Sequence, residues 1–429
     1  MSREMKDSGV EWIGEIPENW DVLPIKRNYR IVAGATPKSD KPENWDGEIP
    51  WITPSDYKTE DKYILSGKKS ITEKGYNSCS TTMVPANSII FSKRAPVGTV
   101  AISANELCTN QGCLSCVPLN KSNSVFGYYS MIAGKNAFEM AALGTTFMEI
   151  SADAFANMKL PYCGITEQQQ IVHFLDRKCT AIDTAIEKTK KSIEKLEEYK
   201  KAVITKAVTK GIDPNARMKN SGVKWIGEIP EGWKVTKTKY LFRILKRIAG
   251  REGFDVISIT QKGLKIKDIT SNEGQVAENY SNYQFVFPGD FAMNHMDLLT
   301  GWVDLSALTG VTSPDYRVFH KINESVNDDY YKYVFQSLYF NKVYYGLAQG
   351  VAEVGRKRLQ APAFKELKLP CPPADEPAKI AAYIKNKCMA IDALIKKKQT
   401  AINKWEEYKK SLIYYAVTGK IDCRNEVIE

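Results

Sequence analysis

The chain contains one architecture twice, because a fifteen-residue segment near its start recurs near its middle. SGVEWIGEIPENWDV at residues 8–22 returns as SGVKWIGEIPEGWKV at residues 221–235, with twelve identical residues at an offset of 213. Residues 182–213 and 391–422 form a second matching pair, with 17 of 32 residues identical at an offset of 209. A period this long excludes solenoids and propellers, whose units run to about 20–50 residues. The sequence therefore predicts a tandem duplication of a large unit with a pseudo-twofold relation.

Composition places the chain among ordinary globular proteins. Its 429 residues are 43% hydrophobic and 26% charged, and this length accommodates about three domains with real cores. No apolar run approaches the roughly 18 residues of a membrane-spanning helix. The polar start MSREMKDSGV lacks the apolar core of a signal peptide. We expect a cytoplasmic protein with no membrane partner.

The nine cysteines are odd in number and follow no disulfide pattern, which favours reduced thiols. Cys113 and Cys116 form a C-x-x-C pair. A structural zinc site needs two further ligands at suitable spacing, and the chain has only three histidines. We interpret this pair as a strand interior and expect no metal.

Charge permits a nucleic-acid partner without requiring one. Lysine and arginine number 60 against 50 acidic residues, and such an excess suits contacts with phosphates. Motifs for chemistry are missing from the sequence: it has no phosphate-binding loop, no dinucleotide fingerprint and no Asn-Pro-Pro-Tyr/Phe run. The histidines form no recognisable constellation with a nucleophile. We therefore expect a chain that is not an enzyme.

Each half has the same order of parts. The Trp/Pro opening is followed by about 130 residues of strand and turn signals, a Leu-Pro pair and a long helix. Strands are expected at residues 49–53, 88–92, 99–103, 114–117, 256–260, 285–287 and 316–319. The predicted class is α+β: two α/β domains in pseudo-twofold tandem, separated by two long helices that form an antiparallel coiled coil. The expected boundaries are 1–163 and 214–372 for the domains, and 164–213 and 373–429 for the helical spacers.

The two helices carry matching apolar seams. Residues 182–207 and 391–416 place mostly apolar side chains at heptad positions a and d, and Trp405 falls on the second seam. Lys200 and Lys409 occupy the same a position in the two copies. A polar residue at a costs stability but fixes register. The simplest interpretation is that the two seams bury each other, with residues 171–208 as the first helix.

The residues also carry a resemblance that covers essentially the whole chain. The matching pieces are W-I-G-E-I-P-x-x-W in both copies, P-W-I-T-P-S-D at 50–56, S-K-R-A-P-V-G at 92–98, T-N-Q-G at 109–112, G-T-T-F-M-E-I at 144–150, L-P-Y-C-G-I-T-E-Q-Q at 160–169 and A-V-T-x-x-I-D in both copies. In this order the chain resembles the specificity subunit of type I restriction-modification enzymes. It departs from the pattern at Pro377, where the first copy and the family have glutamine.

The resemblance implies a function. The family is a non-catalytic, sequence-specific DNA-binding subunit in which each target-recognition domain reads one half of a bipartite double-stranded target and the helices set the spacing. The implied partners are two modification subunits, which methylate adenine using S-adenosylmethionine, and restriction subunits, which use ATP and Mg²⁺. No cofactor is expected in this chain. An alternative from another class is a two-headed protein-interaction scaffold without DNA binding.

Candidate DNA-binding residues are basic or amide side chains and hydroxyls on predicted loops, since these side chains contact phosphates and base edges. In the first half they are Lys38, Ser55, Lys93 and Arg94. In the second half they are Arg251, Gln261, Lys262, Asn294, Arg356, Lys357 and Arg358. The tryptophans of the two openings, Trp12, Trp20, Trp225 and Trp233, are interpreted instead as hydrophobic anchors of each module to the helices or to a modification subunit.

Overall fold

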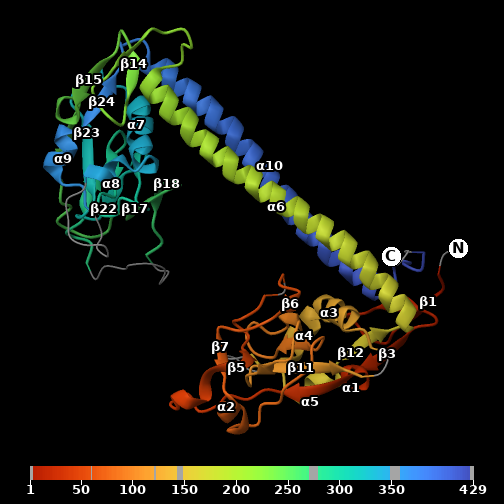
Figure 1. The fold of residues 1–429 in the computed structure, drawn as a ribbon. Coiled ribbons are helices and arrows are strands. Elements are labelled where there is room, and N and C mark those ends of the chain that lie inside the picture. The colour runs from red at the N-terminus through yellow and green to blue at the C-terminus, as the bar shows by residue number, and fades with distance from the viewer. Residues whose placement is uncertain are drawn as a thin grey trace. The chain divides into compact units, whose positions relative to one another are not determined.

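The computed structural model describes residues 3–58, 60–119, 122–142, 148–269, 279–347 and 358–425. The chain divides into two compact units, of which the first contains Met1–Thr189 and Thr400–Glu429 and the second Lys190–Gln399. Each unit holds one α/β module together with part of each of two long helices, α6 (Ile165–Lys210) and α10 (Pro377–Val417) (Figure 1). Both helices therefore contribute to both units.

The first module is built on a five-stranded sheet of order β4-β11-β8-β9-β6. Its strands are β4 (Tyr29–Ala33), β11 (Cys113–Pro118), β8 (Ile89–Ser92), β9 (Val100–Ser103) and β6 (Tyr63–Ile64). Neighbouring strands are antiparallel except for the parallel pair β6 and β9. Every residue of β8 and β9 is buried, which explains why these strands are continuous apolar runs rather than alternating patterns.

Smaller elements surround this sheet. A three-stranded sheet contains β10 (Cys108–Thr109), β5 (Trp45–Ile52) and β7 (Lys69–Ile71), and two pairs join β1 (Met5–Asp7) with β2 (Glu15–Pro17) and β12 (Lys159–Tyr162) with β3 (Asp21–Pro24). The helical elements are α1 (Ile25–Asn28), η1 (Pro42–Asn44), α2 (Glu73–Asn77), α3 (Ser124–Ala133), α4 (Lys135–Ala141) and α5 (Ala152–Asn157).

The second module repeats the centre of the first. Its four-stranded sheet has the order β16-β23-β20-β21, formed by β16 (Phe242–Leu245), β23 (Arg317–Lys321), β20 (Phe291–Met293) and β21 (Val303–Leu305). All its pairings are antiparallel. By position in the chain and in the sheet, these strands correspond to β4, β11, β8 and β9.

The remaining elements of the second module form pairs and short helices. The pairs are β13 (Met218–Asn220) with β14 (Glu228–Pro230), β15 (Lys234–Lys237) with β24 (Lys368–Cys371), β17 (Ile257–Thr260) with β18 (Gly263–Ile266) and β19 (Gln284–Val286) with β22 (Gly310–Thr312). The helices are η2 (Thr238–Tyr240), α7 (Asp328–Phe340), α8 (Val343–Leu347) and α9 (Ala361–Glu366). Each of the seven strand runs expected from the sequence overlaps an observed strand.

The repeated tryptophans anchor each module to the start of a long helix. Trp20 and Trp233 are fully buried. The Trp20 indole N–H donates to Glu167 Oε2 at 3.0 Å, and the Trp233 indole N–H donates to Glu376 Oε2 at 2.9 Å. Burial of a large ring combined with a satisfied N–H fixes both position and orientation. The interpretation of these two residues as anchors to the helices is confirmed.

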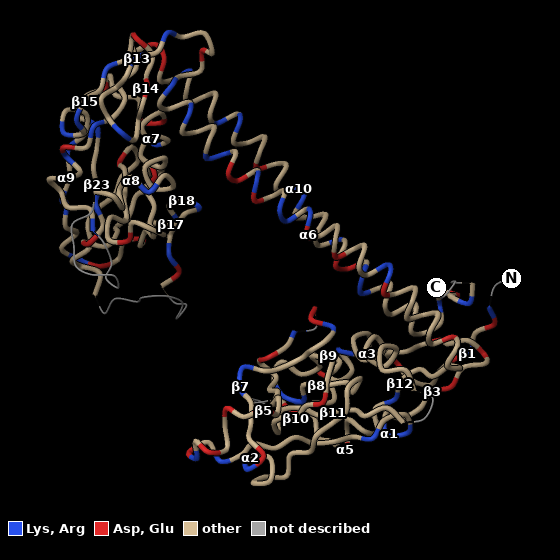
Figure 2. Tube along the Cα trace, in the orientation of Figure 1, with Lys and Arg blue, Asp and Glu red and all other residues tan. Residues whose placement is uncertain are grey.

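The seam lysines pair with aspartates across the helices. In the first unit Lys409 Nζ lies 2.7 Å from a carboxylate oxygen of Asp183, and in the second Lys200 Nζ lies 2.7 Å from one of Asp392. The two aspartates occupy equivalent repeat positions. In the first unit the side-chain amide of Gln170 also donates to the carbonyl of Arg424. The earlier residue of α6, Gln170, thus faces the later residue Arg424, whereas Asp183 faces Lys409. The two segments are therefore antiparallel. Lysines and acids are interspersed along both helices (Figure 2).

The seam itself follows the expected register with one exception. Ile182, Ile391, Ile402 and Leu412 are each 5% exposed or less. Trp405, which the register places in the interface, is instead 41% exposed, with its ring 6.1 Å from that of Tyr408. That expectation is wrong. An indole is larger than the branched aliphatic side chains that suit a two-helix seam, and here it lies against a neighbouring ring outside it.

The C-terminal end of each long helix packs on a repeated opening segment. In the first unit Tyr414 OH and Lys420 Nζ both donate to the carbonyl of Ile13, at 3.0 and 2.7 Å. In the second unit Lys210 Nζ lies 3.8 Å from Glu228 Oε2, and Val208 shares a buried core cluster with Ile226 and Trp233. Gly211 follows α6 with a φ of +71°, a left-handed conformation that glycine adopts without strain.

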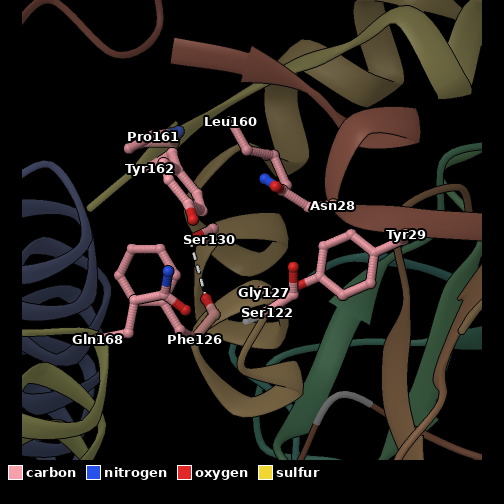
Figure 3. Close-up of a pocket in the computed structure, with 10 residues that line it drawn as sticks. All are labelled: Asn28, Tyr29, Ser122, Phe126, Gly127, Ser130, Leu160, Pro161, Tyr162 and Gln168. Atoms are coloured by element: carbon pink, nitrogen blue, oxygen red, sulfur yellow. Dashed lines mark hydrogen bonds between the residues drawn. The ribbon is translucent and has the colours of Figure 1, made fainter. Parts of the chain in front are cut away.

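Gln168 links the first helix to the module that precedes it. Its amide is buried, accepts from the Asn123 backbone N–H at 3.1 Å and donates to the carbonyl of Cys163 at 2.8 Å. It borders a cavity of about 10 Å³ shared with Tyr29 and Phe126 (Figure 3), a volume that suits about one water molecule. In the second repeat this position is Pro377, which begins α10, as expected for proline in a first helical turn.

Candidate nucleic-acid interface

The motif loops of the first module lie together, linked by backbone hydrogen bonds. The Ala35 N–H donates to the carbonyl of Thr109 at 3.0 Å, and the Asn110 N–H donates to that of Ile52 at 2.9 Å. The Lys93 N–H donates to the carbonyl of Gly112 at 3.0 Å. Four segments that are separate in sequence, 34–38, 50–56, 92–98 and 109–112, therefore form one connected cluster, which we call the first loop cluster.

Three of the candidate residues in this cluster, Lys38, Ser55 and Arg94, are exposed. Lys38 and Ser55 both lie on its surface. The carbonyl of Lys38 accepts the Trp45 indole N–H at 3.2 Å, and the hydroxyl of Ser55 lies 2.9 Å from that of Thr53. Backbone and hydroxyl contacts thus fix both segments, while the Lys38 ammonium extends from a fixed backbone.

Lys93 and Arg94 share one carboxylate. Lys93 Nζ lies 2.8 Å from Glu149 Oε1, and Arg94 Nε lies 2.7 Å from Glu149 Oε2. Hydrogen bonding and charge, from Lys93 first and from Arg94, hold the pKa of Glu149 below its usual value despite some desolvation. The Ile150 N–H donates to the carbonyl of Lys93 at 3.0 Å, so residues 149 and 150 join the first loop cluster.

In the second module the corresponding loop follows β20. Asn294 lies in it, with its side-chain oxygen accepting the Met296 N–H at 3.2 Å. The Leu359 N–H donates to the carbonyl of His295 at 3.1 Å, which brings the exposed Arg358 next to this loop. Gln261, at the turn between β17 and β18, donates to the carbonyl of Thr300 at 3.2 Å. Gln261, Lys262, Asn294 and Arg358 therefore belong to one second loop cluster.

The remaining candidates stand apart from that cluster or beyond the described structure. Arg251 is exposed and its guanidinium lies 5.3 Å from the centre of the Phe254 ring. The loop that carries it bonds to residues 280–283. Arg356 and Lys357 lie outside the described residues.

Burial of His295 favours its neutral form. Desolvation, and then the charges of Arg317 and Arg358, lower the pKa of His295 from 6.5 to about 4. The Arg317 guanidinium is itself buried and donates to the carbonyl of Leu359 at 2.8 Å. The second loop cluster therefore gathers arginines around a neutral imidazole, whereas the first pairs its cations with an acid.

Seven of the nine cysteines are buried, and Cys79 and Cys371 are half-buried. Cys113 and Cys116 lie within β11 and are fully buried, and burial raises the pKa of the Cys113 thiol to about 12. The interpretation of this pair as a strand interior is confirmed. Among the described residues no three histidine, cysteine or acidic side chains are grouped to hold a metal ion, and none of the described helices is both long and apolar enough to cross a membrane.

Comparison with known proteins points to one family. The family described as the type I restriction modification DNA specificity domain matches residues 17–198. The MjaVIII specificity subunit of Methanocaldococcus jannaschii is 25% identical over 96% of this chain and 95% of its own length. Over nearly its whole length the chain is similar to the type I restriction-modification specificity subunits.

Two further likenesses bear on the extent of the match. The MjaIX specificity subunit of the same organism is 38% identical, but the aligned part spans 43% of this chain and 43% of that protein. A chain in a solved structure titled for complex assembly and conformational transition of the type I R-M system has a TM-score of 0.69 at 13% identity, covering 95% of this chain and 99% of that one. This last likeness concerns the fold.

This similarity indicates the role of the chain. A specificity subunit is the non-catalytic, DNA-recognising member of its system; it binds no cofactor, and S-adenosylmethionine and ATP belong to the other subunits. The interaction scaffold without DNA binding is therefore set aside. Sequence reasoning missed five acidic partners of the named residues: Glu149, the seam aspartates Asp183 and Asp392, and the glutamates Glu167 and Glu376 that accept the indole N–H groups.

Proposed function

We propose that this specificity subunit reads a bipartite double-stranded DNA target, with each module reading one half. The observation that carries the proposal is that the modules share a four-stranded sheet of the same strand order but differ in the loops after β8 and β20. A common framework presents loops in a common geometry, and different loops recognise different bases.

The two loop clusters are the proposed reading surfaces. Lys38, Ser55, Lys93 and Arg94 serve the first module, and Arg251, Gln261, Lys262, Asn294 and Arg356 to Arg358 serve the second. The described members are basic, amide and hydroxyl side chains that are exposed or half-buried on hydrogen-bonded loops. This supports the proposal, because base readout needs hydrogen-bonding groups in fixed positions.

The proposed partners are two modification subunits, restriction subunits and DNA, assembled in the cytoplasm. The pseudo-twofold repeat supports two modification subunits, since equivalent surfaces offer equivalent binding sites. The proposed domains are residues 1–163 and 214–372, with helical spacers at 164–213 and 373–429. We expect α6, which at 46 residues is about 69 Å long at 1.5 Å per residue, to set the distance between half-sites.

Purification of the chain with its modification subunit, followed by mapping of methylated adenines in host DNA, tests this function. We expect one split target with a fixed unspecified gap. Binding to the target duplex should weaken steeply with salt, because phosphate contacts release counterions. Methylation without a split target, or retention on duplex DNA that is insensitive to salt, would contradict the proposal.

The spacing role has its own test. Inserting Ala-Glu-Ala-Leu after Lys191 lengthens α6 by about 6 Å and rotates the remainder of the helix by about 40°. We expect a preference for half-sites about one or two base pairs further apart, with the same bases read in each half, because base pairs are stacked about 3.4 Å apart. An inserted variant that methylates at the original spacing would show that the helices do not set the distance.

A further inference from the structure

In the first loop cluster the cations of Lys93 and Arg94 share the carboxylate of Glu149. Of these, Lys93 is 17% exposed, Glu149 35% and Arg94 47%. Lys93 is thus largely enclosed, while Arg94 faces solvent with half of its side chain. In this ion-pair cluster the inner cation, Lys93, neutralises the acid, and the outer cation, Arg94, is exposed to solvent.

Backbone contacts fix the acid relative to the cations. Arg94 and Glu149 form an antiparallel β-bridge, and the neighbouring Ile150 N–H bonds the carbonyl of Lys93. The Ser92 hydroxyl donates to the carbonyl of Arg94 at 2.8 Å. The Arg94 side chain is therefore held both at its backbone and at Nε, which orients the plane of the guanidinium.

This arrangement suits a base rather than a phosphate. A phosphate contact gains from net positive charge and tolerates a mobile side chain, so a carboxylate 2.7 Å away would weaken it. Guanine O6 and N7 require two donors in one plane, and arginine is the common residue that supplies them. Glu149 contacts Arg94 at Nε, which is not one of the two terminal amino groups that could serve a base edge.

We propose that Glu149, backed by Lys93, positions Arg94 to read a guanine in the major groove of the half-site recognised by the first module. This inference rests on the proposed function and assigns each of the three residues a different part within the first reading surface: Arg94 contacts the base, Glu149 orients the Arg94 guanidinium, and Lys93 supports them by pairing with Glu149. Arg358 stands at the position of Glu149 in the second module, so the same device is not repeated there.

The test uses the complete complex of this chain with its modification subunits and duplexes of the mapped target. Each guanine of the first half-site is replaced in turn by 7-deazaguanine, which lacks the N7 acceptor. We expect one replacement to weaken binding of the unaltered complex about 10-fold, and Arg94→Lys to weaken binding of the unmodified target by about 10-fold to 100-fold. The 7-deazaguanine duplex should then be bound by Arg94→Lys no worse than the unmodified one.

Glu149→Gln separates positioning from charge. Loss of one negative charge should strengthen binding to unrelated duplex DNA and steepen its salt dependence, while preference for the guanine at that one position falls by about 3-fold to 10-fold. A merely structural role for Glu149 would not give these opposite changes. The matched control is Glu366→Gln, because Glu366 also binds two lysines, Lys237 and Lys239, each at 2.6 Å; we expect unchanged preference in the first half-site.

The outcomes are distinct. If the unaltered complex binds all duplexes equally, the proposed function fails. If it binds its target specifically but Glu149→Gln and Arg94→Lys keep the full guanine preference, the inference fails alone. A uniform loss over all sequences in Arg94→Lys, with no effect of 7-deazaguanine, would make Arg94 a phosphate contact and overturn the inference. Thermal unfolding identifies a misfolded variant, and the 7-deazaguanine series on the unaltered complex then decides.

Discussion

The two modules share a sheet but distribute charge differently around it. After β8, Lys93 and Arg94 meet the acid Glu149, whereas after β20, Asn294 and His295 lie beside Arg358. The sheets are alike because buried strands must pack against the same kinds of helix, and a change of register would expose the core. Exposed loops carry no such constraint. The difference shows that a fixed framework can present loops of opposite electrostatic design.

The strongest test of this comparison is exchange of a whole module. Replacing residues 34–161 with the corresponding segment of a related specificity subunit should change one half of the DNA target completely and leave the other half unchanged. The reason is that each loop cluster is bonded within its own unit. Mapping of methylated sites measures this, and a change in both halves would show that the modules do not read independently.

The anchors should be equally important in the two units. Trp20→Ala and Trp233→Ala each remove a fully buried ring and the indole donor to Glu167 or Glu376, so each should cost about 3–5 kcal/mol of unfolding free energy in its own unit. Hydrogen exchange read peptide by peptide assigns the loss to a unit. Trp405→Ala, at an exposed indole, is the control and should cost less than about 1 kcal/mol.

Lowering the pH should destabilise the second unit before the first. His295 has a pKa of about 4 in the folded chain, against about 6.5 when unfolded. Between these values only the unfolded chain binds the proton, so stability of the second unit falls as pH decreases from 6.5 to 4 and is unaffected above 6.5. Because the ring is only partly enclosed, we expect a loss of about 1–3 kcal/mol at pH 4.

The first unit gives the contrasting response. Glu149 has a lowered pKa, so its contribution is present above the ordinary carboxyl range and is lost only as pH falls below about 4.5. Hydrogen exchange at pH 5 to 6.5, corrected for intrinsic rates, should therefore show loss in the second unit alone. His295→Asn should abolish that loss; equal losses in both units would refute the assignment.

Substitutions at Gln168 and Pro377 test whether these equivalent positions of the two repeats contribute differently to stability. Gln168→Leu leaves the Asn123 N–H and the Cys163 carbonyl without their partner, and should cost about 1–3 kcal/mol. Pro377→Gln changes the first residue of α10 and should cost no more than about 0.5 kcal/mol. Denaturant unfolding of the two variants measures the difference, and similar costs would mean that Gln168 acts only through helix formation.

The smallest expected effect concerns the seam lysines. Double-mutant cycles on Lys200 with Asp392 and on Lys409 with Asp183 should each give about 0.5–1 kcal/mol, because all four side chains are partly exposed. The two values should agree and should both shrink at high salt. Unequal couplings would show that the pseudo-twofold relation does not extend to the energetics of the seam.

The repeats made the framework predictable from the sequence. Matching openings fixed the two modules, heptad spacing placed the helices, and apolar runs marked the strands. The partners of charged residues were not predictable, since Arg94 and Glu149 are 55 positions apart and nothing local to either residue indicates that they meet. The exposure of Trp405 was also missed, because heptad position does not report side-chain size.

The two compact units do not coincide with the two repeats, and this has a consequence for synthesis. The second unit is one continuous stretch, Lys190–Gln399, whereas the first needs Thr400–Glu429 to complete its core. On the ribosome the amino-terminal module therefore emerges first but lacks the Tyr414 and Lys420 contacts to Ile13 until residues 400–429 have been synthesised. We expect the second unit to reach its native state first, while the nascent first module remains incomplete until residues 400–429 are available.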